Sequence, residues 1–344
     1  MISQALIGKT VINPYNETGV ISRIDENGRV EIQYKARTTL YVSDVFDRGI
    51  LRFADPEIEA KLRFESLKQD MKVASIEINR CLEELNSLVG LDNIKEIVKD
   101  LICQIKISKM REAYGLKCPE ITKHMVFVGN PGTGKTTVAR IIAKIYKALG
   151  VLPKGQLVEV ERSALVAGYQ GQTALKTKDI IDKALGGVLF IDEAYSLCRD
   201  KDDDFGREAL DTLVKEIEDH RNDLMVIVAG YKKEMETFLD NNPGLRSRFK
   251  TIINFDDYSG DELYLILESI LKSNDYLLSA EAEEVVKKYF RDKKCLSGNG
   301  RTVRNSFEEM IRYQAKRLDS LEKINKKLLV TIEAEDISQI NTIY

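Results

Sequence analysis

The sequence is poor in the residues that build metal centres and disulfide frameworks. Its 344 residues include only two histidines, His124 and His220, which excludes a histidine-rich metal site. Five cysteines are scattered without paired spacing. An odd, unpatterned set argues against a disulfide framework and is typical of a reducing compartment. We therefore expect a cytoplasmic protein.

Long hydrophobic runs and a strong charge imbalance are also missing. No apolar stretch approaches the roughly twenty residues of a membrane-spanning helix, and the first residues lack the basic and apolar regions of a signal peptide. The formal net charge of −3 gives no electrostatic basis for binding nucleic acid in bulk. These absences predict a soluble protein with no membrane partner, and they disfavour a nucleic-acid partner.

A glycine-rich loop carries the clearest signal. It comprises Gly129, Asn130, Pro131, Gly132, Thr133, Gly134, Lys135, Thr136 and Thr137. This is the spacing of a phosphate-binding loop, and it lies between a buried-strand pattern at 125–128 and a helical pattern at 138–143. Backbone N–H groups and the helix N-terminus attract phosphates. Lys135 can reach the β and γ oxygens, and the Thr136 hydroxyl can hold Mg²⁺. The loop therefore predicts a nucleotide enzyme.

A second, acidic motif follows downstream. The four apolar residues 188–191 are typical of a buried parallel strand, and Asp192 and Glu193 follow them. A carboxylate at this edge of a sheet can hold Mg²⁺, and the next one can polarise the attacking water. By itself the pair could merely cap the next segment. The phosphate loop upstream favours the metal and water roles.

The pattern divides the chain into four predicted domains. Residues 1–55 combine short strands with an Asn27-Gly28 turn, which predicts a small SH3-like β-barrel that either packs or recruits a partner. Residues 56–84 read as an amphipathic helical connector. Residues 85–257 alternate strands and helices, which predicts an α/β core with a parallel sheet covered on both faces. Residues 258–344 are helical and open with a capping box at Ser259–Glu262. The five strands of the core are expected at 125–128, 157–160, 188–191, 224–229 and 252–255.

Five segments in order carry a resemblance to a known family. They are residues 88–91, the phosphate loop, and residues 189–197, 242–249 and 298–305. Together they resemble the AAA+ ATPases, specifically the group of red-type Rubisco activases and stage V sporulation protein K, over roughly residues 85–340. The resemblance implies a P-loop AAA+ core with a C-terminal helical lid, ATP hydrolysis with Mg²⁺, and Val89 and Gly90 at the nucleotide.

The resemblance also implies roles for four arginines. We expect Pro243 and Gly244 to break the chain and display two guanidinium groups beside the fifth strand. Arg248, or else Arg246, would be an arginine finger that stabilises charge on a neighbouring subunit's γ-phosphate. Pairing with surface acids is the alternative for Arg246. Arg301 and Arg304 are one helical turn apart. Arg304 best fits the lid residue that senses the nucleotide, assisted by Arg301.

Two tyrosines complete the predicted site residues. Tyr169 lies between Gly168 and Gly171, in the position of a loop that lines the central pore in similar rings and grips a polypeptide. The alternative is a ring folded back onto its own core. Tyr231 follows the fourth strand, where many AAA+ proteins place a smaller polar residue that orients water.

The sequence thus predicts a Mg²⁺-dependent ATPase that assembles into a homo-oligomeric ring, expected to be a hexamer, and remodels a protein client. Two alternatives stay open. One is a nucleic-acid motor resembling a clamp loader, which the charge balance disfavours. The other is a nucleotide-switched adaptor with little turnover, which the intact Glu193 disfavours.

Overall fold

Strands and helices of the computed structural model fall into two compact units. One contains residues Met1–Val73 and Cys103–Pro119, and the other contains Ala74–Ile102 and Glu120–Tyr344. The structure describes residues 6–35, 37–41, 45–46, 48, 51–119, 122–169, 171–198, 203–240, 242–291 and 298–338. Helices α1 (Pro56–Asn86) and α2 (Asp92–Ala113) each run from one unit into the other. The four predicted domains stay a prediction.

The first unit contains a five-stranded antiparallel sheet with the order β4-β3-β2-β1-β5. The strands are β1 (Thr10–Ile12), β2 (Thr18–Ile24), β3 (Val30–Gln33), β4 (Thr38–Tyr41) and β5 (Arg52–Phe53). Alternate residues such as Ile21 and Ile32 are buried in one small core. Gly28, at φ 77°, makes the expected tight turn, where the Asp25 carboxylate accepts two backbone N–H groups. The hairpin is confirmed.

The predicted connector is one uninterrupted helix, α1. In the part of the chain that the structure describes, neither α1 nor any other helix is long and apolar enough to cross a membrane. The apolar residues of α1 are spaced between many charged ones, so the helix depends on packing along one face.

The second unit is built on a parallel sheet with the order β10-β6-β9-β8-β7. Its strands are β6 (Met125–Gly129), β7 (Leu157–Val160), β8 (Val188–Ile191), β9 (Met225–Gly230) and β10 (Thr251–Phe255). These five strands and their parallel arrangement confirm the predicted α/β core. Because all strands point the same way, the residues that follow β6, β8 and β9 meet at one edge of the sheet.

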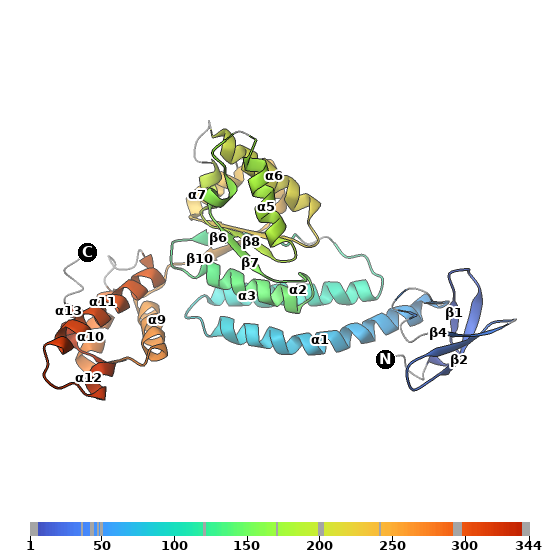
Figure 1. Cartoon of the computed structure of the whole chain (residues 1–344), viewed down its shortest axis with the longest axis horizontal. Helices are drawn as coiled ribbons and strands as arrows, with labels where there is room; N and C mark the ends of the chain where they lie inside the picture. The colour runs from blue at the N-terminus through green and yellow to red at the C-terminus, as the bar shows by residue number, and fades with distance from the viewer. Residues whose placement is uncertain are drawn as a thin grey trace. The chain divides into compact units, whose positions relative to one another are not determined.

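Helices cover both faces of this sheet (Figure 1), with α3 on one side and α5, α6 and α7 on the other. The covering elements are α3 (Lys135–Ala148), α4 (Arg162–Leu165), α5 (Thr173–Ala184), the 3-10 helix η2 (Ala194–Cys198), α6 (Asp204–Asp219), α7 (Lys232–Asp240) and α8 (Pro243–Arg248). Val126, Leu189 and Val228 face one core, together with Leu213 and Phe238 from the helices. The opposite face carries the aromatic ring of Phe127, which contacts the rings of Phe190 and Phe255.

The C-terminal part is a helical lid. It consists of α9 (Gly260–Ser273), β11 (Leu277–Leu278), α10 (Ala280–Arg291), α11 (Gly300–Asp319), α12 (Lys326–Val330), β12 (Thr331–Ile332) and α13 (Ala334–Ser338). The predicted capping box is confirmed at the start of α9. The Ser259 hydroxyl accepts the Glu262 N–H, and the Glu262 carboxylate accepts the Ser259 N–H at 2.7 Å.

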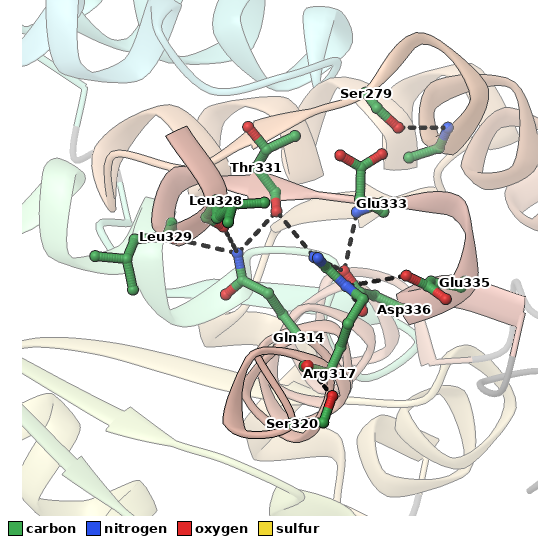
Figure 2. A network of polar contacts seen from close by, with 11 residues as sticks. Ser279, Gln314, Arg317, Ser320, Leu328, Leu329, Thr331, Glu333, Glu335 and Asp336 are labelled. Carbon is green, nitrogen blue, oxygen red and sulfur yellow. Dashed lines mark hydrogen bonds and ion pairs between the residues drawn. The ribbon is translucent and has the colours of Figure 1, made fainter. Parts of the chain in front are cut away.

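Helix α11 is tied to the end of the lid by two polar side chains, Gln314 and Arg317 (Figure 2). The Gln314 amide donates to the carbonyl oxygens of Leu328, Leu329 and Thr331 at 3.3, 3.1 and 2.9 Å. The two N–H groups of this buried amide are thus shared among three carbonyls at and just after the end of the short helix α12, and the Thr331 carbonyl also accepts from Arg317.

Arg317 makes the second tie. Its guanidinium donates twice to the Asp336 carboxylate, at 2.8 Å each, and Asp336 is 1% exposed. The same carboxylate accepts the Glu333 N–H at 2.9 Å. A paired, hydrogen-bonded buried charge of this kind fixes geometry, and removal of one partner is costly.

Candidate nucleotide site

A cavity of about 450 Å³ lies between the phosphate loop and the lid. Of the predicted site residues it is lined by Val89, Gly129, Pro131, Gly132, Gly134, Lys135, Thr136, Thr137, Asp192, Glu193, Tyr231, Arg301 and Arg304. Gly90, Asn130 and Thr133 lie next to it in the chain without lining it. Tyr169, Arg246 and Arg248 lie elsewhere. The structure therefore brings the loop, the acidic pair and the two lid arginines together.

The phosphate loop has the backbone that glycine allows. Gly132 and Gly134 have φ values of 77° and 94°, in the left-handed region that other residues rarely adopt. Gly134 is the N-cap of α3, so the N-terminus of that helix faces the cavity wall. The buried Thr133 hydroxyl donates to the Asn130 carbonyl at 2.8 Å and holds the turn closed.

Lys135 is bound to the loop itself. Its ammonium donates to the carbonyl oxygens of Gly129 and Asn130, both at 2.8 Å. Burial lowers the pKa of Lys135, and the nearby Asp192 carboxylate acts in the opposite direction. A phosphate in the cavity would supply the negative charge that favours the ammonium form, so the site suits an anionic ligand.

Oxygen donors suited to Mg²⁺ lie beside Lys135. Thr136 contributes a hydroxyl and Asp192 a carboxylate. The described residues contain no group of three or more His, Cys, Asp or Glu that could hold a metal by themselves. The donor set therefore fits Mg²⁺, which takes few protein ligands and completes its shell with phosphate and water oxygens. The Thr136 hydroxyl donates to Glu159 of β7 at 3.3 Å, a contact that the sequence pattern did not indicate.

Glu193 has an unusual backbone. Its φ is 47°, and its N–H donates to the Asp192 side chain at 3.0 Å. Its carbonyl accepts the Ser196 N–H at 2.8 Å, where η2 begins. A left-handed non-glycine residue costs of the order of 1–3 kcal/mol and is found where surrounding structure enforces it. With this backbone, Glu193 lines the same cavity as Lys135 and Asp192.

Three residues that were not predicted join the phosphate loop to the lid. They are Asp257 and Tyr258, between the sheet and α9, and Asn299 before α11. Tyr258 donates its hydroxyl proton to the Thr133 carbonyl at 3.3 Å. Asp257 and Asn299 form hydrogen bonds with each other and with the loop. An Asn-Gly pair directly before a helix was the one signal that could have suggested Asn299.

Gly90 lies next to the cavity, and Tyr231 lines it. Gly90, at φ 61°, lies against the lid, and a Cβ there would overlap the Glu262 carboxylate. Tyr231 directly follows β9, and its carbonyl accepts the Met235 N–H at the start of α7. Its ring lies 6.0 Å from that of Tyr195. The position after β9 thus presents an aromatic ring to the cavity.

Arg246 and Arg248 both lie on α8, outside the cavity. The expected chain break before them is wrong, because Pro243 begins α8 and the Asn242 side chain caps it. Arg248 pairs with Glu218 at 2.9 Å and its side chain is 25% exposed, whereas that of Arg246 is 56% exposed and pairs with Asp240. Of the two, Arg246 is therefore more accessible to a neighbouring molecule.

Tyr169 is at the tip of a loop with a well-anchored base. Tyr169 itself is 74% exposed, so its ring does not fold back onto the core. The Thr173 hydroxyl accepts the Ala167 N–H, and Thr177 and Lys176 of α5 donate to the carbonyls of Leu165 and Val166. Gln170, the next residue, lies outside the described part of the chain. The base of the loop is therefore hydrogen-bonded to α5, while the Tyr169 ring at its tip is exposed.

Known proteins are similar to this chain in sequence and in fold. Residues 125–257 match the ATPase family associated with various cellular activities (AAA), and residues 259–342 match the AAA lid domain. The chain is 44% identical to stage V sporulation protein K of Bacillus subtilis over 81% of its own length and 88% of that protein. It is 42% identical to the chloroplastic ribulose bisphosphate carboxylase/oxygenase activase of Cyanidioschyzon merolae, over 76% and 91% respectively. The crystal structure of the FIGL-1 AAA domain in complex with ADP has a TM-score of 0.55 at 17% identity, covering 75% of this chain and 82% of that one, which shows a shared fold.

Proposed function

Because the chain belongs to the AAA ATPase family, we propose that it assembles into a ring, expected to be a hexamer, and uses ATP hydrolysis to remodel a protein client. The protein is an ATPase that binds nucleotide. One observation carries the proposal: the phosphate loop, the Asp192–Glu193 pair and the lid arginines line a single cavity. Arrangement of these groups around one cavity suits hydrolysis of a bound triphosphate.

In this proposal each residue has a defined role. The phosphate loop, from Gly129 to Thr137, binds the triphosphate through backbone N–H groups. Lys135 leaves its two carbonyl partners and donates to the β and γ oxygens instead. Thr136 and Asp192 would hold Mg²⁺, which when bound neutralises phosphate charge. Glu193 accepts a hydrogen bond from the attacking water and so raises its nucleophilicity.

Subunits would share each site. Arg246 and Arg248 do not line the cavity of their own chain, so we assign the arginine finger to a neighbouring copy, with Arg248 first and Arg246 second as the sequence predicts. The greater exposure of Arg246 supports testing both. Turnover per chain should therefore rise with concentration as the ring assembles. Full turnover by a chain that stays monomeric would contradict this.

The client would be a protein that contacts Tyr169. Tyr169 is exposed on an anchored loop, which suits non-specific aromatic contact with a polypeptide. The relatives named above are a sporulation protein and a carboxylase activase, so the client of this chain is not fixed by similarity. We propose that the N-terminal sheet is an SH3-like barrel that recruits a partner.

Glu193→Gln tests the function directly. This variant should bind ATP, assemble and hold its client because hydrolysis is blocked. When purified Glu193→Gln is incubated with cell extract in ATP and then pulled down, its client protein should remain bound. Exchange into ADP should release that client. Lys135→Ala is the control, since it cannot bind the triphosphate and should retain nothing. Retention of DNA instead would support a nucleic-acid motor, and normal remodelling without turnover would support an adaptor.

A further inference from the structure

Asp257 and Asn299 make a polar connection between the phosphate loop and the lid. The Asn130 amide donates to both oxygens of the Asp257 carboxylate at 2.9 Å, and the Asn299 amide donates to Asp257 Oδ1 at 2.8 Å. Asp257 therefore accepts from a loop residue and a lid residue at once. Both are charge-assisted hydrogen bonds, which are stronger than neutral ones.

Asn299 is fully buried, and both ends of its side-chain amide form hydrogen bonds. It is 0% exposed, and its backbone has a φ of 50°. Its side-chain oxygen accepts the Tyr258 N–H at 2.9 Å, while its amide donates to Asp257 and, at 3.4 Å, to the Pro131 carbonyl. With a ψ of −131°, its backbone has the conformation of the first central residue of a type II′ turn, where Gly, Asn and Asp are favoured. A buried amide with both ends bonded fixes one position for the start of α11.

The backbones of the loop and the lid also meet here. The Gly300 N–H donates to the Gly132 carbonyl at 3.1 Å. A Cβ at Gly132 would overlap the carbonyl oxygen of Gly298, so only glycine permits this approach. The outer turn of the phosphate loop and the first turn of α11 are in direct contact.

Arg301 and Arg304 lie on the first two turns of α11 and line the nucleotide cavity. We propose that Asp257 and Asn299 are positioning residues that hold the start of α11 against the phosphate loop, and thereby set Arg301 and Arg304 over the nucleotide phosphates. This rests on the proposed function, in which these arginines contact the nucleotide. Neither Asp257 nor Asn299 lines the cavity, so in this inference their effect on the ligand comes through the placement of α11.

The experiment exchanges the two side chains. Asn299→Asp places two carboxylates against each other and should weaken MgADP binding by the full-length chain at least tenfold, about the effect of losing one charge-assisted hydrogen bond. Combining Asp257→Asn with Asn299→Asp restores a donor–acceptor pair across the same contact. The amide introduced at position 257 can donate to the carboxylate introduced at position 299, and its carbonyl oxygen can still accept from Asn130. Because Asn299 also donates to the Pro131 carbonyl, which a carboxylate cannot do, the double variant should bind MgADP more tightly than Asn299→Asp but less tightly than wild type. Calorimetry measures the affinities.

Asp256→Asn is the matched control. It removes the same charge one residue away, from an exposed side chain, and should leave MgADP affinity unchanged. If the double variant binds no better than Asn299→Asp, the inference is overturned. If Asn299→Asp does not fold, the MgADP affinity of Asp257→Asn is compared with that of Asp256→Asn instead. Asp257→Asn should bind MgADP more weakly, and equal affinities for these two variants would overturn the inference.

Two further variants separate this inference from the proposed function. Lys135→Ala and Arg304→Ala should each weaken MgADP binding if the cavity is the nucleotide site. If neither does, the proposed function fails. If both do, Asn299→Asp should cause little further loss in a chain that already lacks Arg301 and Arg304. If Asn299→Asp still lowers MgADP affinity by the full amount in that background, the positioning role is refuted. The assignment of the cavity as the nucleotide site would then still stand.

Discussion

The two five-stranded sheets of the protein differ in how many of their faces are buried. Strands β8 and β9 are buried at every residue, whereas β2 alternates buried and exposed positions. In the central strands β6, β8 and β9 of the parallel sheet, polar side chains appear only after the strand ends, next to the nucleotide cavity. The outer strands β7 and β10 also carry polar residues, Glu159 and Asn254. In the antiparallel sheet, exposed positions within the strands carry polar residues such as Ser22 and Arg23, alongside the exposed Val20 and Leu40. A polar residue directly after a central parallel strand therefore indicates a functional role. A polar residue on the exposed face of the antiparallel sheet indicates only contact with solvent.

The largest expected effect concerns Glu193, which lies just beyond the C-terminal end of strand β8 of the parallel sheet. Glu193→Gln should reduce ATP turnover by at least about a hundredfold, since a general base contributes that much or more. Nucleotide affinity should change little, because the loop is untouched. A steady-state ATPase assay and a fluorescent-nucleotide titration measure the two. Glu161→Gln, at an exposed acid that directly follows β7, is the matched control. Equal losses in both variants would remove Glu193 from its role.

A stability test of the lid ranks next. Arg317→Ala leaves the Asp336 carboxylate buried without its partner and should lower the free energy of unfolding of the second unit by about 3 kcal/mol. Arg312 is the control because its ion pair with Glu309 is on the surface, so Arg312→Ala should cost little. Urea denaturation followed by circular dichroism gives both values. Similar losses would mean that the network in Figure 2 adds nothing to lid stability.

A core substitution in the antiparallel sheet should separate stability from nucleotide binding. Ile32 is fully buried in the small core of the first unit. Ile32→Ala should destabilise that unit by about 2–3 kcal/mol through the cavity it creates. Affinity for MgADP should stay at the wild-type value. A matching loss of affinity would show that the two units fold or act together, and so would break the comparison.

The smallest effect concerns pH. His124 accepts the Val226 N–H, and burial lowers its pKa to about 4. The unfolded chain, with a pKa near 6.5, therefore binds the proton more readily, and stability falls as pH drops from 6.5 toward 4. At pH 5.5 the loss is about 1 kcal/mol relative to pH 7. His124→Asn should abolish this slope in urea denaturation, and an unchanged slope would assign it to other groups.

Much of the second unit could be predicted because its elements are marked by local patterns. All five strands of the parallel sheet occur where apolar runs were expected, and the capping box at Ser259 is formed. The helix at Pro243 was missed. Proline at the first helical position and asparagine as its cap are also helix-start signals, and they outweighed the expected break. The assignments of the cavity residues stay predictions, although the structure brings most of them together.

The amino-acid order by itself determined the strand–helix alternation, the phosphate loop and the acidic pair, because each depends on residues adjacent in the chain. Only the tertiary structure decided that Asp257 lies between Asn130 and Asn299, that Thr136 bonds Glu159, and that Arg248 pairs with Glu218. These partners are far apart in sequence, and nothing local to either one specifies the other. Their contacts arise from the order of strands in the sheet and from the packing of the lid, which bring distant segments within hydrogen-bond reach.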